Sequence, residues 1–224
     1  MTFHILTIFP DLFDPYLKES VIGKGIQKGA IKTKIYDLRS FTKDKHQKVD
    51  DKAYGGGPGM VLKIEPLVLA LVKIFKGKKK ERCLVVLLKP SGLELSNQLG
   101  NTWVKKYDHI IFLAGRYEGF DDRLGSVLKD IGVKSQELSI GPYVLTGGEL
   151  PALVAMDVIS RQIPGVLGKL ESLEEKRHGT GVPTYTRPEV FKYKGKEYKV
   201  PKVLISGHHA EVKRWRADKG KRSS

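Results

Sequence analysis

The feature that most constrains the fold is an alternation of short apolar runs with segments of helical spacing. The runs are rich in β-branched residues, as buried strands are, and they cover Phe3–Phe9, Lys32–Tyr36, Cys83–Leu88 and His109–Ala114. Between them, Glu65–Phe75 and Arg123–Lys129 repeat apolar residues at helical intervals. Strands that alternate with helices predict an α/β fold with a mostly parallel sheet. Such sheets bind ligands beyond the carboxyl ends of their strands, here in the loops after Leu88 and Ala114.

Charge and cysteine content narrow the class of protein further. The 224 residues carry a formal net charge of +15 and a pI near 9.7, which indicates a polyanionic partner such as nucleic acid. Cys83 is the only cysteine, so the chain has neither an intrachain disulfide nor a cysteine-rich zinc site. The N-terminus lacks the pattern of a signal peptide, and no apolar stretch is as long as a membrane helix. We therefore expect a cytoplasmic protein without a membrane partner.

Changes of composition suggest three parts, residues 1–164, a linker at 165–184 and a short basic domain at 185–224. The segment Leu150–Ile159 is apolar nearly all round, which fits either a core helix or a dimer face. The linker is charged and Gly-rich without periodicity. From Lys192 to the end there are eleven Lys and Arg against three Asp and Glu. On a predicted helix around Trp215 these charges indicate either a phosphate-binding surface or a solvated face.

Three glycine-rich clusters are the candidates for a ligand site, because motifs for nucleotide hydrolysis, zinc proteolysis and ordinary esterase chemistry are absent. Asp50–Met60 has four glycines in five residues, a conformational cost that is typical of close backbone approach to a ligand or of a flexible hairpin. Leu113–Asp121 follows a predicted strand and combines two glycines with an arginine and carboxylates. Ile140–Pro151 leads into the apolar helix. Two such loops at one sheet edge could enclose a planar ligand such as adenine.

These clusters also carry a resemblance to a known family. Together with three further blocks they follow the order and spacing seen in the bacterial tRNA (guanine-N1)-methyltransferases, the further blocks being Ile163–Gly168, Tyr185–Val190 and Ser206–His209. The resemblance extends from Phe3 to Arg216. It implies transfer of a methyl group from S-adenosylmethionine to N1 of the guanosine immediately 3′ of the anticodon in tRNA. A knotted methyltransferase with another RNA target and a catalytically inactive RNA-binding homologue are the alternatives.

The resemblance also implies an architecture that periodicity could not reveal. It implies a deep trefoil knot in the parallel α/β domain, an exception to the rule that chains do not thread loops. It further implies a homodimer with active sites at the subunit interface and a small C-terminal helical domain that binds tRNA. That domain is expected to be truncated, because the chain stops soon after Trp215. A requirement for Mg²⁺ is possible by the same resemblance.

The resemblance also implies site residues, which are the positions of this sequence that match the family's motifs. Those that match the S-adenosylmethionine site are Pro90, Gly115, Tyr117, Glu118, Ile140, Gly141, Pro142, Tyr143, Val144, Leu145, Gly147, Gly148 and Pro151. Pro142 replaces an acidic residue that is usual in the family, which removes a charge and a backbone donor. The residues expected to contact tRNA are Asp50, Arg187, His209, Lys213, Arg214 and Arg216.

The expected catalytic residues are Arg161 and a carboxylate of the linker. Arg161 matches the family's catalytic arginine and could stabilise negative charge on guanine O6, although a basic residue near a helix end also favours the helix dipole. The family's general base is an aspartate, but Lys176 stands at that position in a somewhat shorter linker. We expect Glu175 to replace it, with Glu174 and then His178 as alternatives.

Overall fold

The computed structural model describes residues 1–167 and 181–220. The chain forms two compact units, Met1–Leu167 and Gly168–Ser224, which are described separately here. Most of the predicted linker, residues 165–184, lies outside the described residues. Within the described parts, no helix combines the length and apolarity that crossing a membrane would require.

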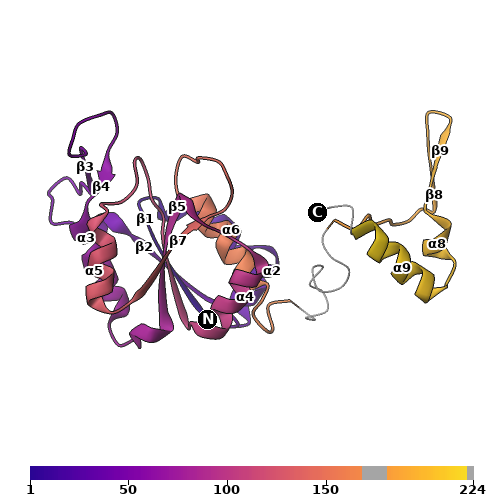
Figure 1. Ribbon diagram of the computed structural model, residues 1–224, viewed down its shortest axis with the longest axis horizontal. Coiled ribbons are helices and arrows are strands. Elements are labelled where there is room, and N and C mark those ends of the chain that lie inside the picture. The colour runs from indigo at the N-terminus through magenta and orange to yellow at the C-terminus, as the bar shows by residue number, and fades with distance from the viewer. Residues whose placement is uncertain (168–180, 221–224) are drawn as a thin grey trace. The chain divides into compact units, whose positions relative to one another are not determined.

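The first unit is built on a five-stranded sheet in which every neighbouring pair of strands is parallel. The strand order is β2-β1-β6-β5-β7 (Figure 1). The strands are β1 (Thr2–Thr7), β2 (Lys32–Asp37), β5 (Cys83–Glu94), β6 (His109–Leu113) and β7 (Lys134–Ser139). The predicted α/β class with a mostly parallel sheet is confirmed. The edge strand β7 was not predicted, because its sequence is mostly polar and only its last two residues are buried.

Helices cover both faces of this sheet (Figure 1). One hydrophobic cluster joins the sheet to α1 (Asp14–Lys18), α2 (Ser20–Gln27), α4 (Asn97–Lys106) and α6 (Glu149–Ser160). A second cluster joins the opposite face to α3 (Ile64–Phe75) and α5 (Arg123–Ile131). Because both faces are covered, the buried stretches of the central strands are mainly apolar. The predicted strands and the predicted helical segments Glu65–Phe75, Arg123–Lys129 and Leu150–Ile159 are confirmed, whereas α1, α2 and α4 were not predicted.

The second unit consists of a hairpin and two helices. The hairpin pairs β8 (Val190–Tyr193) with β9 (Lys196–Lys199), and the helices are α8 (Lys202–Ile205) and α9 (His209–Gly220). Trp215 of α9 lies against Tyr185, with 6.3 Å between the ring centroids. The predicted helix around Trp215 is confirmed, whereas the hairpin was not anticipated.

A histidine is buried within the central sheet. His4 of β1 is fully buried, and its two ring nitrogens lie 3.1 Å from the Tyr36 hydroxyl and 3.2 Å from His109 Nδ1. Burial, with the nearby positive charge of His109 and of Lys78 and Lys34, lowers the pKa of His4 from 6.5 to about 3. His4 therefore stays neutral in the folded protein at pH values where an unfolded chain would protonate it.

This difference makes stability depend on pH. Below pH 6.5 the unfolded chain binds a proton at His4 that the folded chain does not bind until about pH 3. We predict that lowering the pH from 7.5 to 5 reduces the free energy of unfolding by about 2 kcal/mol through this residue. Urea unfolding of the wild type and of His4→Gln at both pH values measures the effect. The variant should lose that part of the pH dependence, and an equal dependence in both proteins would contradict the assignment.

Candidate active site

A cavity of about 460 Å³ lies beyond the carboxyl ends of the sheet strands in the first unit. Three segments and the start of a helix form its walls. They are the stretch from Leu88 to Ser91 in β5, the loop Gly115–Phe120 after β6, the loop Ser139–Gly148 after β7, and Pro151 of α6. This edge carries the loops after Leu88 and Ala114, where the sequence predicted a ligand site.

The cavity collects most of the residues that were matched to a cofactor site. All of these line it except Pro142, namely Pro90, Gly115, Tyr117, Glu118, Ile140, Gly141, Tyr143, Val144, Leu145, Gly147, Gly148 and Pro151. Several polar lining residues were not among those predicted, namely Lys89, Ser91, Arg116, Asp122, Ser139 and Thr146. Each of these residues lies within or next to a predicted loop, and this position in the sequence is the signal that could have identified them.

The wall formed by β5 is an irregularity in the sheet. Leu88 and Leu93 both pair with Leu138 of β7, so the four residues between them leave the regular ladder. The backbone approach that closes this irregularity requires a glycine, since a Cβ on Gly92 would lie 2.5 Å from the Leu138 nitrogen. The displaced residues include Pro90, which reaches the cavity through this departure from regular pairing.

The loop after β7 folds back on itself through local hydrogen bonds. The Ser139 hydroxyl donates to the Gly141 carbonyl at 3.0 Å, and the Tyr143 hydroxyl donates to the Ile140 carbonyl at 3.0 Å. The Tyr143 amide donates to the Gly141 carbonyl at 2.9 Å. These bonds fix a turn whose side chains at Tyr143 and Val144 are exposed.

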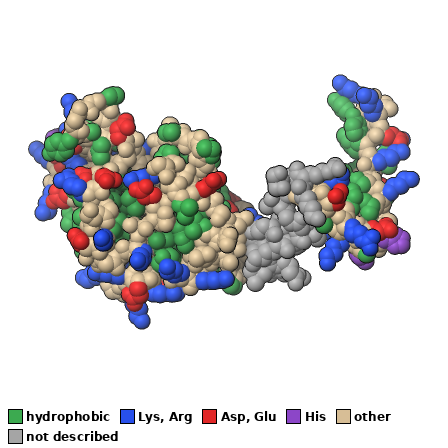
Figure 2. Space-filling view, in the orientation of Figure 1, with side chains coloured by type: hydrophobic (Ala, Val, Ile, Leu, Met, Phe, Trp, Pro, Cys, Tyr) green, Lys and Arg blue, Asp and Glu red, His purple; other side chains and the backbone are tan. Residues whose placement is uncertain are grey.

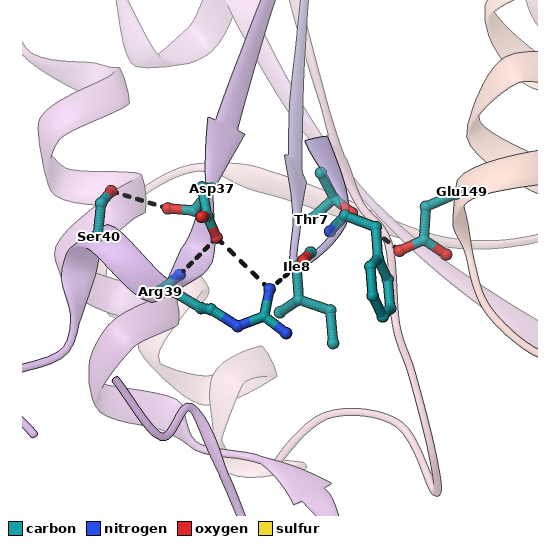
Figure 3. Close-up of polar contacts among 7 residues, drawn as sticks. Thr7, Ile8, Asp37, Arg39, Ser40 and Glu149 are labelled. Carbon is teal, nitrogen blue, oxygen red and sulfur yellow. Dashed lines mark hydrogen bonds and ion pairs between the residues drawn. The ribbon is translucent and has the colours of Figure 1, made fainter. Parts of the chain in front are cut away.

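A buried ion pair joins the loop after β6 to the start of α6. Arg116 Nε lies 3.0 Å from Glu149 Oε2, and the side chain of Glu149 is only 3% exposed. The Thr7 hydroxyl of β1 donates to the other carboxylate oxygen at 2.8 Å (Figure 3). Arg116 also lies over the Phe9 ring, 4.5 Å from its centroid. The Arg116 N–H is not aligned on Glu149 as a hydrogen bond, so the attraction is one of charge.

Two glycines allow the two loops to meet at this pair. The amide of Gly148 donates to the Gly115 carbonyl at 2.8 Å, and Arg116 and Gly147 form an isolated antiparallel bridge. A Cβ on Gly147 would collide with Arg116 Nε, and one on Gly148 would lie 2.7 Å from Ala114 Cα. The second collision is with backbone, which cannot rotate away. Gly148→Ala would therefore force the two cavity loops apart.

The outer wall is supported by the hairpin of β3 (Asp50–Asp51) and β4 (Val61–Leu62). The Glu118 amide donates to the Met60 carbonyl at 3.0 Å, and the Leu62 amide donates to the Gly119 carbonyl at 3.0 Å. Burial and the adjacent Asp50 carboxylate raise the pKa of Tyr117 above its usual value. The first glycine-rich cluster therefore holds the second in place.

The predicted catalytic residues lie elsewhere. Arg161 stands at the C-terminal end of α6, whereas Pro151 at the other end of the same helix lines the cavity. Ten residues of helix separate them by about 15 Å, so Arg161 does not line the cavity of its own chain. Glu174, Glu175, Lys176 and His178 lie outside the described residues. Among the residues that are described, no group of three or more His, Cys, Asp or Glu side chains could hold a metal ion.

The predicted RNA-contacting residues are divided between the two units. Asp50 lies beside Tyr117 in the first unit. The others belong to the second unit, where all five are exposed, Arg187 ahead of the hairpin and His209, Lys213, Arg214 and Arg216 on α9. Their exposure leaves them accessible to a large anionic partner.

Comparison with known proteins identifies the class to which this fold and site belong. The model of the family described as tRNA (Guanine-1)-methyltransferase TrmD matches residues 1–224. A relative from Dictyoglomus turgidum is 45% identical over 215 residues, which cover 95% of this chain and 82% of the relative. One from Mycoplasma mycoides is 43% identical, covering 97% and 86%, and one from Trichodesmium erythraeum is 41% identical, covering 96% and 91%. Each of the three is named tRNA (guanine-N(1)-)-methyltransferase.

The chain therefore belongs to the TrmD family of tRNA (guanine-N1)-methyltransferases. The resemblance stated from the sequence is confirmed.

Proposed function

We propose that this protein transfers a methyl group from S-adenosylmethionine to N1 of the guanosine immediately 3′ of the anticodon in tRNA. The observation that carries the proposal is the cavity at the carboxyl ends of the parallel strands, which gathers the loops matched to the family's cofactor site. Family membership and the strongly basic composition support tRNA as the acceptor.

The cavity has the chemistry that S-adenosylmethionine requires. The turn from Ile140 to Leu145 and the loop at Gly115 offer backbone donors and acceptors to an adenine edge, and Gly147 and Gly148 let the two loops meet closely at the cavity wall. The Glu118 carboxylate suits the cationic part of the ligand. When bound, the cofactor supplies a methyl group already activated on a sulfonium centre.

The remaining chemistry is proton removal and charge stabilisation at guanine. We assign removal of the N1 proton to Glu175, with Glu174 and His178 as alternatives, because Lys176 occupies the usual aspartate position. Negative charge then develops towards O6, where Arg161 provides the compensating cation. The requirement for Mg²⁺ that the resemblance allows stays a prediction, and no step is assigned to the ion.

The position of Arg161 supports a homodimer. Leu150, Val154 and Arg161 are spaced along one face of α6, and the first two are 63% and 42% exposed. The Tyr16 hydroxyl donates to Asp157 on this helix, so α1 borders the same apolar surface. A two-fold axis across this surface would pair the α6 helices antiparallel. Arg161 of the partner subunit would then come to the cavity end of the helix, completing a site that one chain leaves incomplete.

We extend the proposal to the domains and to the chain path. Residues 1–164 would form the knotted methyltransferase domain, residues 165–184 the linker and residues 185–224 the tRNA-binding domain. The whole protein would act in the cytoplasm. Support for the knot comes from the family and from the contact of the loops after β6 and β7 at one sheet edge. Arg187, His209, Lys213, Arg214 and Arg216 would contact tRNA from the second unit, and Asp50 from the first.

Transfer of labelled methyl from S-adenosylmethionine to tRNA tests the function directly. We predict incorporation into a tRNA with guanosine 3′ of its anticodon and none when that base is adenosine, because adenosine N1 carries no proton and its ring has no O6. In the same assay Glu175→Gln should abolish transfer while Glu174→Gln retains it, and S-adenosylmethionine should bind both variants with wild-type affinity.

The outcomes separate the alternatives. Equal incorporation into both tRNAs would indicate a methyltransferase with another RNA target. Binding of S-adenosylmethionine without any transfer would indicate the catalytically inactive homologue. Wild-type transfer by Glu175→Gln would rule out that residue as the base and leave Glu174 or His178.

Mixing two inactive variants tests the shared site. Gly148→Ala damages the cavity and Arg161→Ala removes the cation, so each variant alone should transfer poorly. If Arg161 acts on the partner's cavity, an equal mixture re-formed by denaturation and refolding should recover about a quarter of the wild-type rate, since half of the dimers then hold one intact site of two. Formation of mixed dimers without any recovery would contradict the arrangement.

A further inference from the structure

The β8–β9 hairpin of the second unit has two chemically different faces. Side chains alternate across a strand, and the register places Phe191 opposite Tyr198 and Tyr193 opposite Lys196 on one face. The other face carries Val190 opposite Lys199 and Lys192 opposite Glu197. The face that contains Phe191, Tyr193 and Tyr198 is called the aromatic face below. Figure 2 shows hydrophobic side chains together along one side of this hairpin.

The three rings of the aromatic face form a continuous surface. The Phe191 and Tyr193 centroids are 6.4 Å apart with the ring planes inclined by only 8°, and Phe191 and Tyr198 are 6.3 Å apart. The Phe191–Tyr198 pair crosses the two strands and contributes to the stability of the hairpin. However, each ring remains more than half exposed, at 56%, 55% and 54%. Three adjacent exposed rings on so short a hairpin are typical of a contact surface.

The charges around the rings are positive. Lys194 at the turn lies over the Tyr193 ring, with Nζ 5.4 Å from the centroid, and Lys196 stands beside it on the aromatic face. Neither lysine forms an ion pair within the described residues. On the opposite face, by contrast, Glu197 pairs with Lys192 at 3.1 Å and with Lys199 at 3.0 Å. The unneutralised charge is therefore concentrated where the rings are.

We propose that the aromatic face binds unpaired bases of the substrate RNA by stacking, while Lys194 and Lys196 contact the flanking phosphates. Stacked or offset rings edged by cations are the usual platform for single-stranded nucleic acid, because every base offers a π-face. The positive charge favours RNA over a second protein chain as the occupant. The inference rests on the proposed function for the identity of the RNA, and it adds a tRNA-contacting surface beyond Arg187 and the basic residues of α9.

The test measures binding of the full-length protein to tRNA with guanosine 3′ of the anticodon, at several salt concentrations. Phe191→Leu keeps apolar volume but removes the ring, and we expect its Kd to rise by at least about fivefold. Its salt dependence should be unchanged. Lys196→Gln should instead make the slope of log K against log salt shallower by about 0.7, the loss of one phosphate contact on a single strand.

Two conservative variants separate stacking from damage to the hairpin. Tyr198→Phe retains the ring and should bind tRNA like the wild type, as should Val190→Ala on the opposite face. Wild-type affinity of Phe191→Leu would overturn the inference. If Phe191→Leu without RNA sediments differently from the wild type while its Kd for tRNA is unchanged, the inference is also overturned. The aromatic face would then be a contact with a second copy of the chain.

Failure of this inference is distinguishable from failure of the proposed function. Normal methyl transfer with hairpin variants that bind tRNA normally overturns the stacking surface alone. Tight, ring-dependent tRNA binding without methyl transfer overturns the activity alone. Absence of tRNA binding by the wild type overturns both.

Discussion

The structure of the cavity depends on one buried charge pair. Glu149 is almost inaccessible to solvent, and a buried carboxylate is tolerable only if its charge is compensated. Arg116 supplies the charge and Thr7 a hydrogen bond, so the loop after β6, the start of α6 and the end of β1 are fixed to one another. Arg116 lines the cavity and lies over Phe9, whereas Glu149 does not line it. The glycines at 147 and 148 follow from this arrangement, because any side chain there would occupy the space that the pair and the facing backbone require.

The two units divide the proposed work according to how each is built. The first unit places a rigid, doubly covered sheet behind loops that are tied to each other by backbone hydrogen bonds, which suits precise alignment of a cofactor. The second unit is small, and its hairpin and α9 present exposed rings and cations, which suits a large anionic surface. Alignment of one methyl group needs preorganisation. Attraction of a polyanion needs only charge and accessible contact surface.

Much of this organisation could be predicted from the sequence, for identifiable physical reasons. Strands β1 and β6 and the first half of β5 are buried in a parallel sheet and therefore stand out as apolar runs, whereas the edge strand β7 does not. The cavity loops were visible because close backbone approach demands glycine. The role of Glu149 was missed, since a carboxylate at a helix start is usually solvated and its partner comes from another loop. The β8–β9 hairpin was also missed, although Lys194-Gly195, both with positive φ, is a two-residue turn between alternating aromatic and charged residues.

The central claim is that the pair of Arg116 and Glu149 holds the cavity in the shape that binds S-adenosylmethionine. Calorimetric titration of the cofactor into the wild type, Arg116→Gln, Glu149→Gln and the double variant tests it most directly. Glu149 does not line the cavity, so its effect must pass through the loops. The account predicts that each single change weakens binding and that the double variant binds no more weakly than the worse single variant, a coupling of at least about 1 kcal/mol. Fully additive losses, or unchanged affinity in Glu149→Gln, would contradict it.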